Sequence, residues 1–250
     1  MKIAILQPAY LPWLGFFDLM DQVETFVLLD NVQFEKRSWQ QRNRIKSPTG
    51  LLWLTVPVKS RGLFEQRICE VGVGDNQFWR DHLRSIEMNY RRAPFFADYF
   101  EECGEVLRSS EKGLLADLTS SLIVWLASKL GVTAPVVRAS GLQESGKRTE
   151  LLRDLCIKLN ASEYQSPLGS AEYLLEDMQL MRDANVTVFF QNYAHPQYRQ
   201  LFPPFVPYAS ALDLLFNEGP RSLDVIRSGR REPFLPEQVA AHLAERAVHN

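Results

Sequence analysis

A basic segment near the start of the chain holds the side chains best suited to recognising an anionic ligand. Arginine presents a planar fork of donors that fits phosphate, lysine presents a point charge, and an aromatic ring between them can stack on a base or a sugar. The segment is either a clamp that binds phosphate or a solvated basic loop with its tryptophan in the core. Because it follows a predicted strand, the two interpretations are about equally supported. The segment spans residues 31–46, and its five cations, its tryptophan and the asparagine between the last arginines are Lys36, Arg37, Trp39, Arg42, Asn43, Arg44 and Lys46.

His195 is the best candidate for proton transfer, because imidazole changes its protonation state near neutral pH. It lies just past an apolar run and the polar residues 191–193. The alternative is a structural turn with Pro196 in which the ring is hydrogen-bonded. Asp30 is the carboxylate expected to orient His195 or to bind a substrate amine. Asp213 precedes an apolar stretch, which favours a structural role.

The opening of the chain predicts the unit that positions these groups. Residues 3–6 form a short unbroken apolar run, typical of a strand buried on both faces. Pro12 can begin a helix, and a second apolar run at 25–29 ends in Asp30 and Asn31. This is a βαβ pattern, in which ligands bind beyond the carboxyl ends of the strands. Gln7, Tyr10, Asp30 and Asn31 are therefore expected at a site, together with Asn192 after a later strand.

The rest of the chain predicts one α/β domain over residues 1–250 with a Rossmann-like, mostly parallel sheet. Strands are expected at 51–58, 68–73, 135–139, 162–166 and 186–190. A helical insertion is expected at about 76–131, with helices from Asp75–Asn76 to Tyr90, at 94–107 and at 114–130, the last ending at Gly131. Further helices are expected at 147–159 and 171–184, and a helical C-terminal tail at about 211–250, with helices from about 211 and 220 and after 235.

Composition excludes several classes of function. Hydrophobic residues make up 46% and charged residues 23%, as in ordinary globular proteins, and a net charge of −2 argues against a nucleic-acid binder. The three widely spaced cysteines suit a reducing cytoplasm and show no metal-ligand spacing. No run approaches about 18 apolar residues, so no membrane span is expected. The sequence indicates no metal site and identifies no cofactor.

Three motifs together resemble the WbqC-like protein family. They are residues 7–17 (QPAYLPWLGFF), residues 30–39 (DNVQFEKRSW) with 42–46 (RNRIK), and residues 195–198 (HPQY) with 210–219 (SALDLLFNEG). The family is bacterial and often encoded among O-antigen and surface-polysaccharide genes. This chain has Leu6 before Gln7 where many relatives carry a histidine, and it reads QSPLG at 165–169 where a glycine-rich turn is expected.

The resemblance implies an enzyme of surface-polysaccharide biosynthesis that transfers an aminoacyl or acyl group to a nucleotide-linked amino sugar. In this hypothesis Lys36, Arg37 and Arg42 hold the diphosphate, Tyr10 and Trp39 pack the base or sugar, and His195 moves the proton. The alternatives are a non-catalytic nucleotide-sugar binding or scaffold protein and an ATP-dependent ligase. The residues around Trp13 also resemble the opening of class I nucleotidyltransferases and synthetases, but they lack the His-x-Gly-His motif, so nucleotidyl transfer is not carried over.

Overall fold

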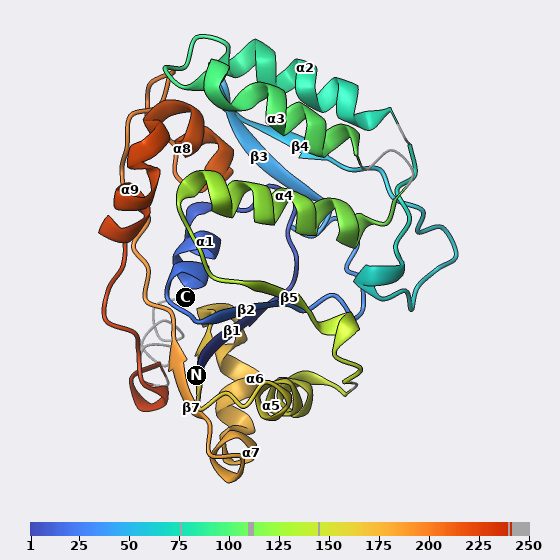
Figure 1. Ribbon diagram of the computed structural model, residues 1–250, viewed down its shortest axis with the longest axis vertical. Helices are drawn as coiled ribbons and strands as arrows, with labels where there is room; N and C mark the ends of the chain where they lie inside the picture. Colours follow the sequence, from blue (N-terminus) through green and yellow to red (C-terminus); the bar gives the residue numbers. More distant parts are fainter. Residues whose placement is uncertain (76, 110–112, 145, 240, 242–250) are drawn as a thin grey trace.

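The computed structural model describes residues 1–75, 77–109, 113–144, 146–239 and 241. It contains a five-stranded sheet in the order β5-β2-β1-β6-β7, in which neighbouring strands are parallel (Figure 1). The predicted α/β class is therefore confirmed. The strands are β1 (Lys2–Leu6), β2 (Thr25–Leu28), β5 (Val136–Arg138), β6 (Glu163–Ser166) and β7 (Thr187–Phe190).

The strand order reverses at β1. The chain steps from β1 outward to β2 and β5, then returns to the other side of β1 to form β6 and β7. Crossovers on opposite sides leave a crevice beyond the carboxyl end of the central strand, where doubly wound sheets bind ligands. Gln7 follows β1 directly and so stands at this point.

Alternating side chains of the central strand enter two separate cores, because successive residues of a strand point to opposite faces. Ala4 packs with α1 (Leu14–Asp21), α4 (Leu115–Leu130) and α8 (Ala211–Glu218) on one face. Ile3 and Ile5 pack on the other face, which three further helices cover (Figure 1). Those helices are α5 (Arg148–Lys158), α6 (Ala171–Glu176) and α7 (Met178–Asp183).

The insertion between β2 and β5 begins with an antiparallel hairpin of β3 (Arg42–Ser47) and β4 (Gly50–Thr55). The sequence predicted β4 three residues too long at its end and missed β3, because β3 is largely polar. In the structure Asn43 and Ile45 are buried while Arg42 and Arg44 are partly exposed, an alternation that polar residues conceal.

The rest of the insertion is helical, as predicted. The expected strand at 68–73 is wrong, since η1 (Ile68–Glu70) is a 3-10 turn followed by single bridges at Gly72 and Val73. Asn76, the proposed helix cap, lies outside the described residues. Gly131 ends α4 with a φ of 85°, a left-handed conformation that glycine adopts without strain. The helices before α4 are α2 (Phe78–Tyr90) and α3 (Phe96–Arg108).

The C-terminal part follows the prediction with two differences. The helix expected at 171–184 is divided into α6 and α7 around Asp177. After α8, helix α9 (Ser222–Ser228) is present, and most of the tail predicted beyond residue 235 lies outside the described residues.

Candidate functional site

A cavity of about 600 Å³ opens at the carboxyl end of β1, where the strand order reverses. Its walls come from the loop after β1, the start of α1, the segment 35–44, and single residues near α5, α6 and α8. Much of the surface is apolar, with a few polar groups, as is usual for small-molecule sites. The polar and aromatic lining residues are Gln7, Trp13, Glu35, Ser38, Trp39, Gln40, Asn43, Arg44, Ser170, Tyr173 and Tyr208.

Arg44 is the cation of this cavity. Its guanidinium carbon lies 5.3 Å from the ring centroids of both Trp39 and Trp53, and these two rings stack at 5.4 Å. Its Nε is buried and has no hydrogen-bond partner among the described residues. A buried donor left unpaired is costly, so an acceptor supplied by a ligand would stabilise this arrangement.

The backbone on both sides of Arg44 is held by other segments of the cavity wall. The side chain of Asn43 accepts a hydrogen bond from the Arg44 N–H at 2.8 Å and donates to the Leu11 carbonyl at 2.8 Å. The Ser210 N–H donates to the Arg44 carbonyl at 2.8 Å. Asn43, expected to bind substrate, lines the cavity, but both of its amide atoms are engaged within the protein.

The loop that carries Trp39 is fixed to the loop after β1. The Gln40 side chain donates to Oε1 of Gln7 at 2.8 Å and accepts from the Glu35 N–H at 3.0 Å. The Tyr10 N–H donates to the Trp39 carbonyl at 2.9 Å. Two of the predicted ligand residues, Gln7 and Trp39, thus line the same cavity although more than thirty residues separate them in the sequence.

Tyr10 supports the cavity from behind and is not among its described lining residues. The ring is fully buried, and its hydroxyl lies 2.7 Å from Nδ1 of His82. Burial lowers the pKa of His82 to about 4, although the Thr55 carbonyl accepts a hydrogen bond from the ring. His82 is therefore neutral at pH 7. Its Nε2 carries the proton, and its Nδ1 accepts a hydrogen bond from the Tyr10 hydroxyl.

The other predicted ligand residues lie away from the described cavity lining. Asn31 donates to the Glu144 carbonyl, and Asn192 donates to the Glu232 carbonyl. The guanidinium carbon of Arg42 lies over the Trp53 ring, 4.4 Å from its centroid. Lys36 lines a second pocket, and the exposed Arg37 lines neither of these two pockets.

Asp30, expected to orient His195 or to bind a substrate amine, has other hydrogen-bond partners among the described residues. Its carboxylate is fully buried and accepts hydrogen bonds from Arg138 Nε at 2.6 Å and from the backbone and hydroxyl of Ser140, both at 2.8 Å. These contacts join the ends of β2 and β5. With its oxygens occupied in this way, Asp30 stabilises the edge of the sheet.

His195 lies behind the cavity wall. Its Nδ1 is 2.9 Å from the Pro196 carbonyl, and its Nε2 accepts a hydrogen bond from the Tyr208 N–H at 3.1 Å. Its ring stacks on Trp13 at 6.1 Å and meets Tyr208 edge-on at 4.9 Å. Burial lowers the pKa of His195 while the Pro196 contact raises it. Both ring nitrogens are engaged, and the general-base role stays a prediction.

Asp213 connects the later motifs to the insertion. It is fully buried and accepts hydrogen bonds from Tyr198 at 2.6 Å, Tyr90 at 2.9 Å and Gln200 at 2.9 Å. Burial raises the pKa of Asp213, and these donors act against that rise. The structural role favoured by the sequence is the one these contacts support.

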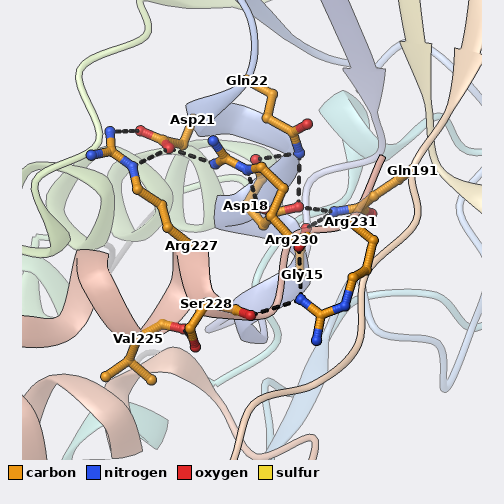
Figure 2. Close-up of polar contacts among 10 residues, drawn as sticks. All are labelled: Gly15, Asp18, Asp21, Gln22, Gln191, Val225, Arg227, Ser228, Arg230 and Arg231. Carbon is orange, nitrogen blue, oxygen red and sulfur yellow. Dashed lines mark hydrogen bonds and ion pairs between the residues drawn. The ribbon is translucent and has the colours of Figure 1, made fainter. Parts of the chain in front are cut away.

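Helix α1, which begins at the cavity, is anchored by an ionic cluster at its far end (Figure 2). Asp18 is fully buried and accepts from Arg230 at 2.9 Å and from Gln191 at 2.8 Å. Asp21 pairs with Arg227 at 2.8 Å and with Arg230 at 2.6 Å. Burial raises the pKa of Asp18 despite these donors, since the charged form is desolvated.

Sequence reasoning missed most of the cavity's polar lining. Glu35 and Gln40 belong to the basic segment, whose charges drew attention away from them. Trp13 belongs to the first family motif but was assigned no role, and Tyr173 and Tyr208 show no sequence signal beyond aromatic character. Arg44 was counted among the cations of the segment but was not singled out, since only the hairpin register turns it toward the cavity.

The described residues contain neither a cluster of metal-ligating side chains nor a membrane-spanning helix. No three histidine, cysteine, aspartate or glutamate side chains in the described part of the chain are grouped to hold a metal ion. No helix within the described ranges is long and apolar enough to cross a membrane.

The strand order defines a doubly wound α/β protein with a cavity at its switch point, where proteins of this class bind ligands. The chain belongs to the WbqC-like protein family, whose model matches residues 7–225. It is 34% identical over 231 residues to the uncharacterized protein Rv1507c of Mycobacterium tuberculosis. The aligned region covers 92% of this chain and 99% of that protein. No solved structure matches the chain.

Proposed function

We propose that the cavity binds a nucleotide-linked amino sugar and that the protein transfers an acyl or aminoacyl group to the sugar amine. The proposal places this reaction in bacterial surface-polysaccharide biosynthesis, in the cytoplasm. The observation that carries it is Arg44, whose buried Nε lacks a partner among the described residues while its guanidinium lies against two tryptophans. A diphosphate would accept from this guanidinium, and a base or sugar would stack on the half-exposed Trp39 ring.

Glu35 is assigned to the amine. It is the one carboxylate among the described lining residues of the cavity, and its backbone N–H is fixed by Gln40. The ammonium group must lose two protons: Glu35 accepts the first before attack, and the second is lost after attack and neutralises the leaving group. The nitrogen then attacks the donor's carbonyl carbon, the C–N bond forms, the bond to the leaving group breaks, and the leaving group takes up a proton.

His195 has a different part in this proposal. To accept a proton from a ligand, its Nε2 would first have to lose the Tyr208 N–H, whereas Glu35 needs no such rearrangement. His195 is therefore assigned the positioning of Trp13 and Tyr208, which its ring contacts. A binding protein without catalysis is the second candidate, favoured by the lack of histidine and cysteine among the described lining residues.

The test is calorimetric titration with nucleotide-linked amino sugars, their hydroxyl analogues and ATP. Arg44→Gln is compared with Arg42→Gln, because both arginines lie over Trp53 but Arg44 alone of the two is in the described cavity lining. We expect amino sugars to bind most tightly, and Arg44→Gln to weaken them about tenfold or more while Arg42→Gln changes them little. Equal effects of the two variants, or binding of ATP alone, would overturn the proposal.

Catalysis is tested separately by supplying an acyl donor and following amide formation. Formation of an N-acylated sugar nucleotide supports the transferase. Tight binding without product from any acyl or aminoacyl donor supports the binding protein instead.

A further inference from the structure

A second concave site, here called the basic pocket, shares the loop 35–41 with the cavity. Its volume is about 480 Å³, and its lining includes Lys36, Lys59 and Arg61. None of its described lining residues is acidic, and none of the three cations forms an ion pair with a described residue. Three like charges in one pocket repel each other, and an anion bound between them removes that repulsion.

The two loops that form the basic pocket are joined by Gln41. This buried side chain donates to the Val56 carbonyl at 3.1 Å and accepts from the Arg37 N–H at 3.0 Å. The Val56 N–H donates to the Gln41 carbonyl at 2.8 Å. The Lys59 N–H is held by the Gly72 carbonyl at 2.9 Å. The pocket is therefore built by fixed backbone, although its cations are flexible side chains.

Adjacent glutamines relate the basic pocket to the cavity. Gln40 lines the cavity and holds the Glu35 N–H, while Gln41 lines the basic pocket and holds the Arg37 N–H. One short loop thus forms a wall of both sites. A ligand in either site would therefore lie against this loop.

We propose that the basic pocket binds the phosphate group of the acyl or aminoacyl donor. This inference rests on the proposed transfer reaction, which needs a second substrate besides the nucleotide-linked sugar. A phosphate-bearing donor held by Lys36, Lys59 and Arg61 reaches around loop 35–41 to present its carbonyl carbon at the cavity. The basic pocket thereby assigns a site to Lys36, which the sequence predicted as a phosphate ligand.

The experiment measures the binding of inorganic pyrophosphate and of coenzyme A to the full chain by calorimetry. The test variant is Lys59→Ala/Arg61→Ala, and the matched control is Lys147→Ala/Arg84→Ala, a pair of exposed cations outside both linings. We expect the test variant to weaken both probes about tenfold or more and the control to leave them unchanged. Binding of a nucleotide-linked amino sugar should be the same in all three proteins.

Three results would overturn the inference. Pyrophosphate binding that is equal in the wild type and the test variant excludes the basic pocket as an anion site. Binding of pyrophosphate, but of neither coenzyme A nor a charged tRNA, excludes a phosphate-bearing acyl or aminoacyl donor as the occupant of the pocket. A loss of nucleotide-sugar affinity in the test variant makes the pocket part of the sugar-nucleotide site. Failure of Arg44→Gln to affect sugar binding contradicts the proposed function alone.

Discussion

Gln7 and Gln40 hydrogen-bond to each other across 2.8 Å, with Nε2 of Gln40 donating to Oε1 of Gln7. This contact joins the end of the central strand to the loop that carries Glu35 and Trp39. Gln40 is buried, and its side-chain oxygen Oε1 accepts a hydrogen bond from the Glu35 N–H. The shape of the cavity therefore depends on one side chain that touches both of its main walls.

Replacing Gln40 by methionine is expected to destabilise the protein by about 1–3 kcal/mol, because the Glu35 N–H loses its acceptor. The measurement is urea unfolding of the wild type and the variant. Gln33→Met is the control, since Gln33 is exposed and donates to the Phe64 carbonyl outside the described cavity lining. Equal losses in the two variants would show that Gln40 has no special part in holding the loop.

Arg230→Met should be strongly destabilising, by about 3–5 kcal/mol, because it leaves the fully buried Asp18 carboxylate without its cation. Adding Asp18→Asn in the same chain should restore part of this loss. Arg227→Met removes an ion pair from a half-exposed arginine and is expected to cost about 1 kcal/mol or less. Thermal unfolding of the four proteins tests this, and a double variant no more stable than Arg230→Met alone would contradict it.

The stability of the protein should fall in acid because of His82. Its pKa is about 4 in the folded state and 6.5 when unfolded, so the unfolded chain takes up the proton first as pH falls. The contribution of neutral His82 to the free energy of unfolding is fully present above pH 6.5. It amounts to about 3 kcal/mol and is lost as the pH falls from 6.5 to 4. His195 acts in the same direction, since its pKa is also lowered.

His82→Gln tests this pH dependence, because glutamine hydrogen-bonds but does not titrate. The free energy of unfolding is measured by urea titration at pH 7 and pH 4. We expect the difference between these two values to be smaller in the variant by about 3 kcal/mol. The same difference in both proteins would mean that other groups cause the acid sensitivity.

Glu35→Gln and His195→Gln should differ in kinetics if the proposed reaction is observed. Removing the proton acceptor at Glu35 should lower kcat by about 10²–10⁴-fold. His195→Gln should mainly raise KM, because Trp13 and Tyr208 lose the ring that positions them. Steady-state kinetics with both substrates measures the split, and a large loss of kcat with unchanged KM in His195→Gln would restore the general-base role.

The sequence by itself determined the α/β class and the family. The short, continuous apolar runs at residues 3–6 and 25–29 differ from the periodic spacing of apolar residues in a helix. Such runs are typical of parallel strands, because both faces of the strand are buried. The same reasoning placed Gln7 at a ligand-binding edge, since a polar residue after the first strand of a βαβ unit lies at the carboxyl end of the sheet. The composition and motifs needed no knowledge of long-range contacts.

Only the tertiary structure decided which of the basic and polar residues share a site. Arg42, Arg44 and Lys36 look equivalent in the sequence, but the β3–β4 register places Arg44 at the cavity, and loop 35–41 places Lys36 in the other pocket. Asp30 and His195 both come after apolar runs in the sequence. In the structure Arg138 and Ser140 donate hydrogen bonds to the Asp30 carboxylate, and backbone groups of Pro196 and Tyr208 contact the ring nitrogens of His195. Side-chain direction and hydrogen-bond partners depend on contacts between distant segments, and local patterns do not contain them.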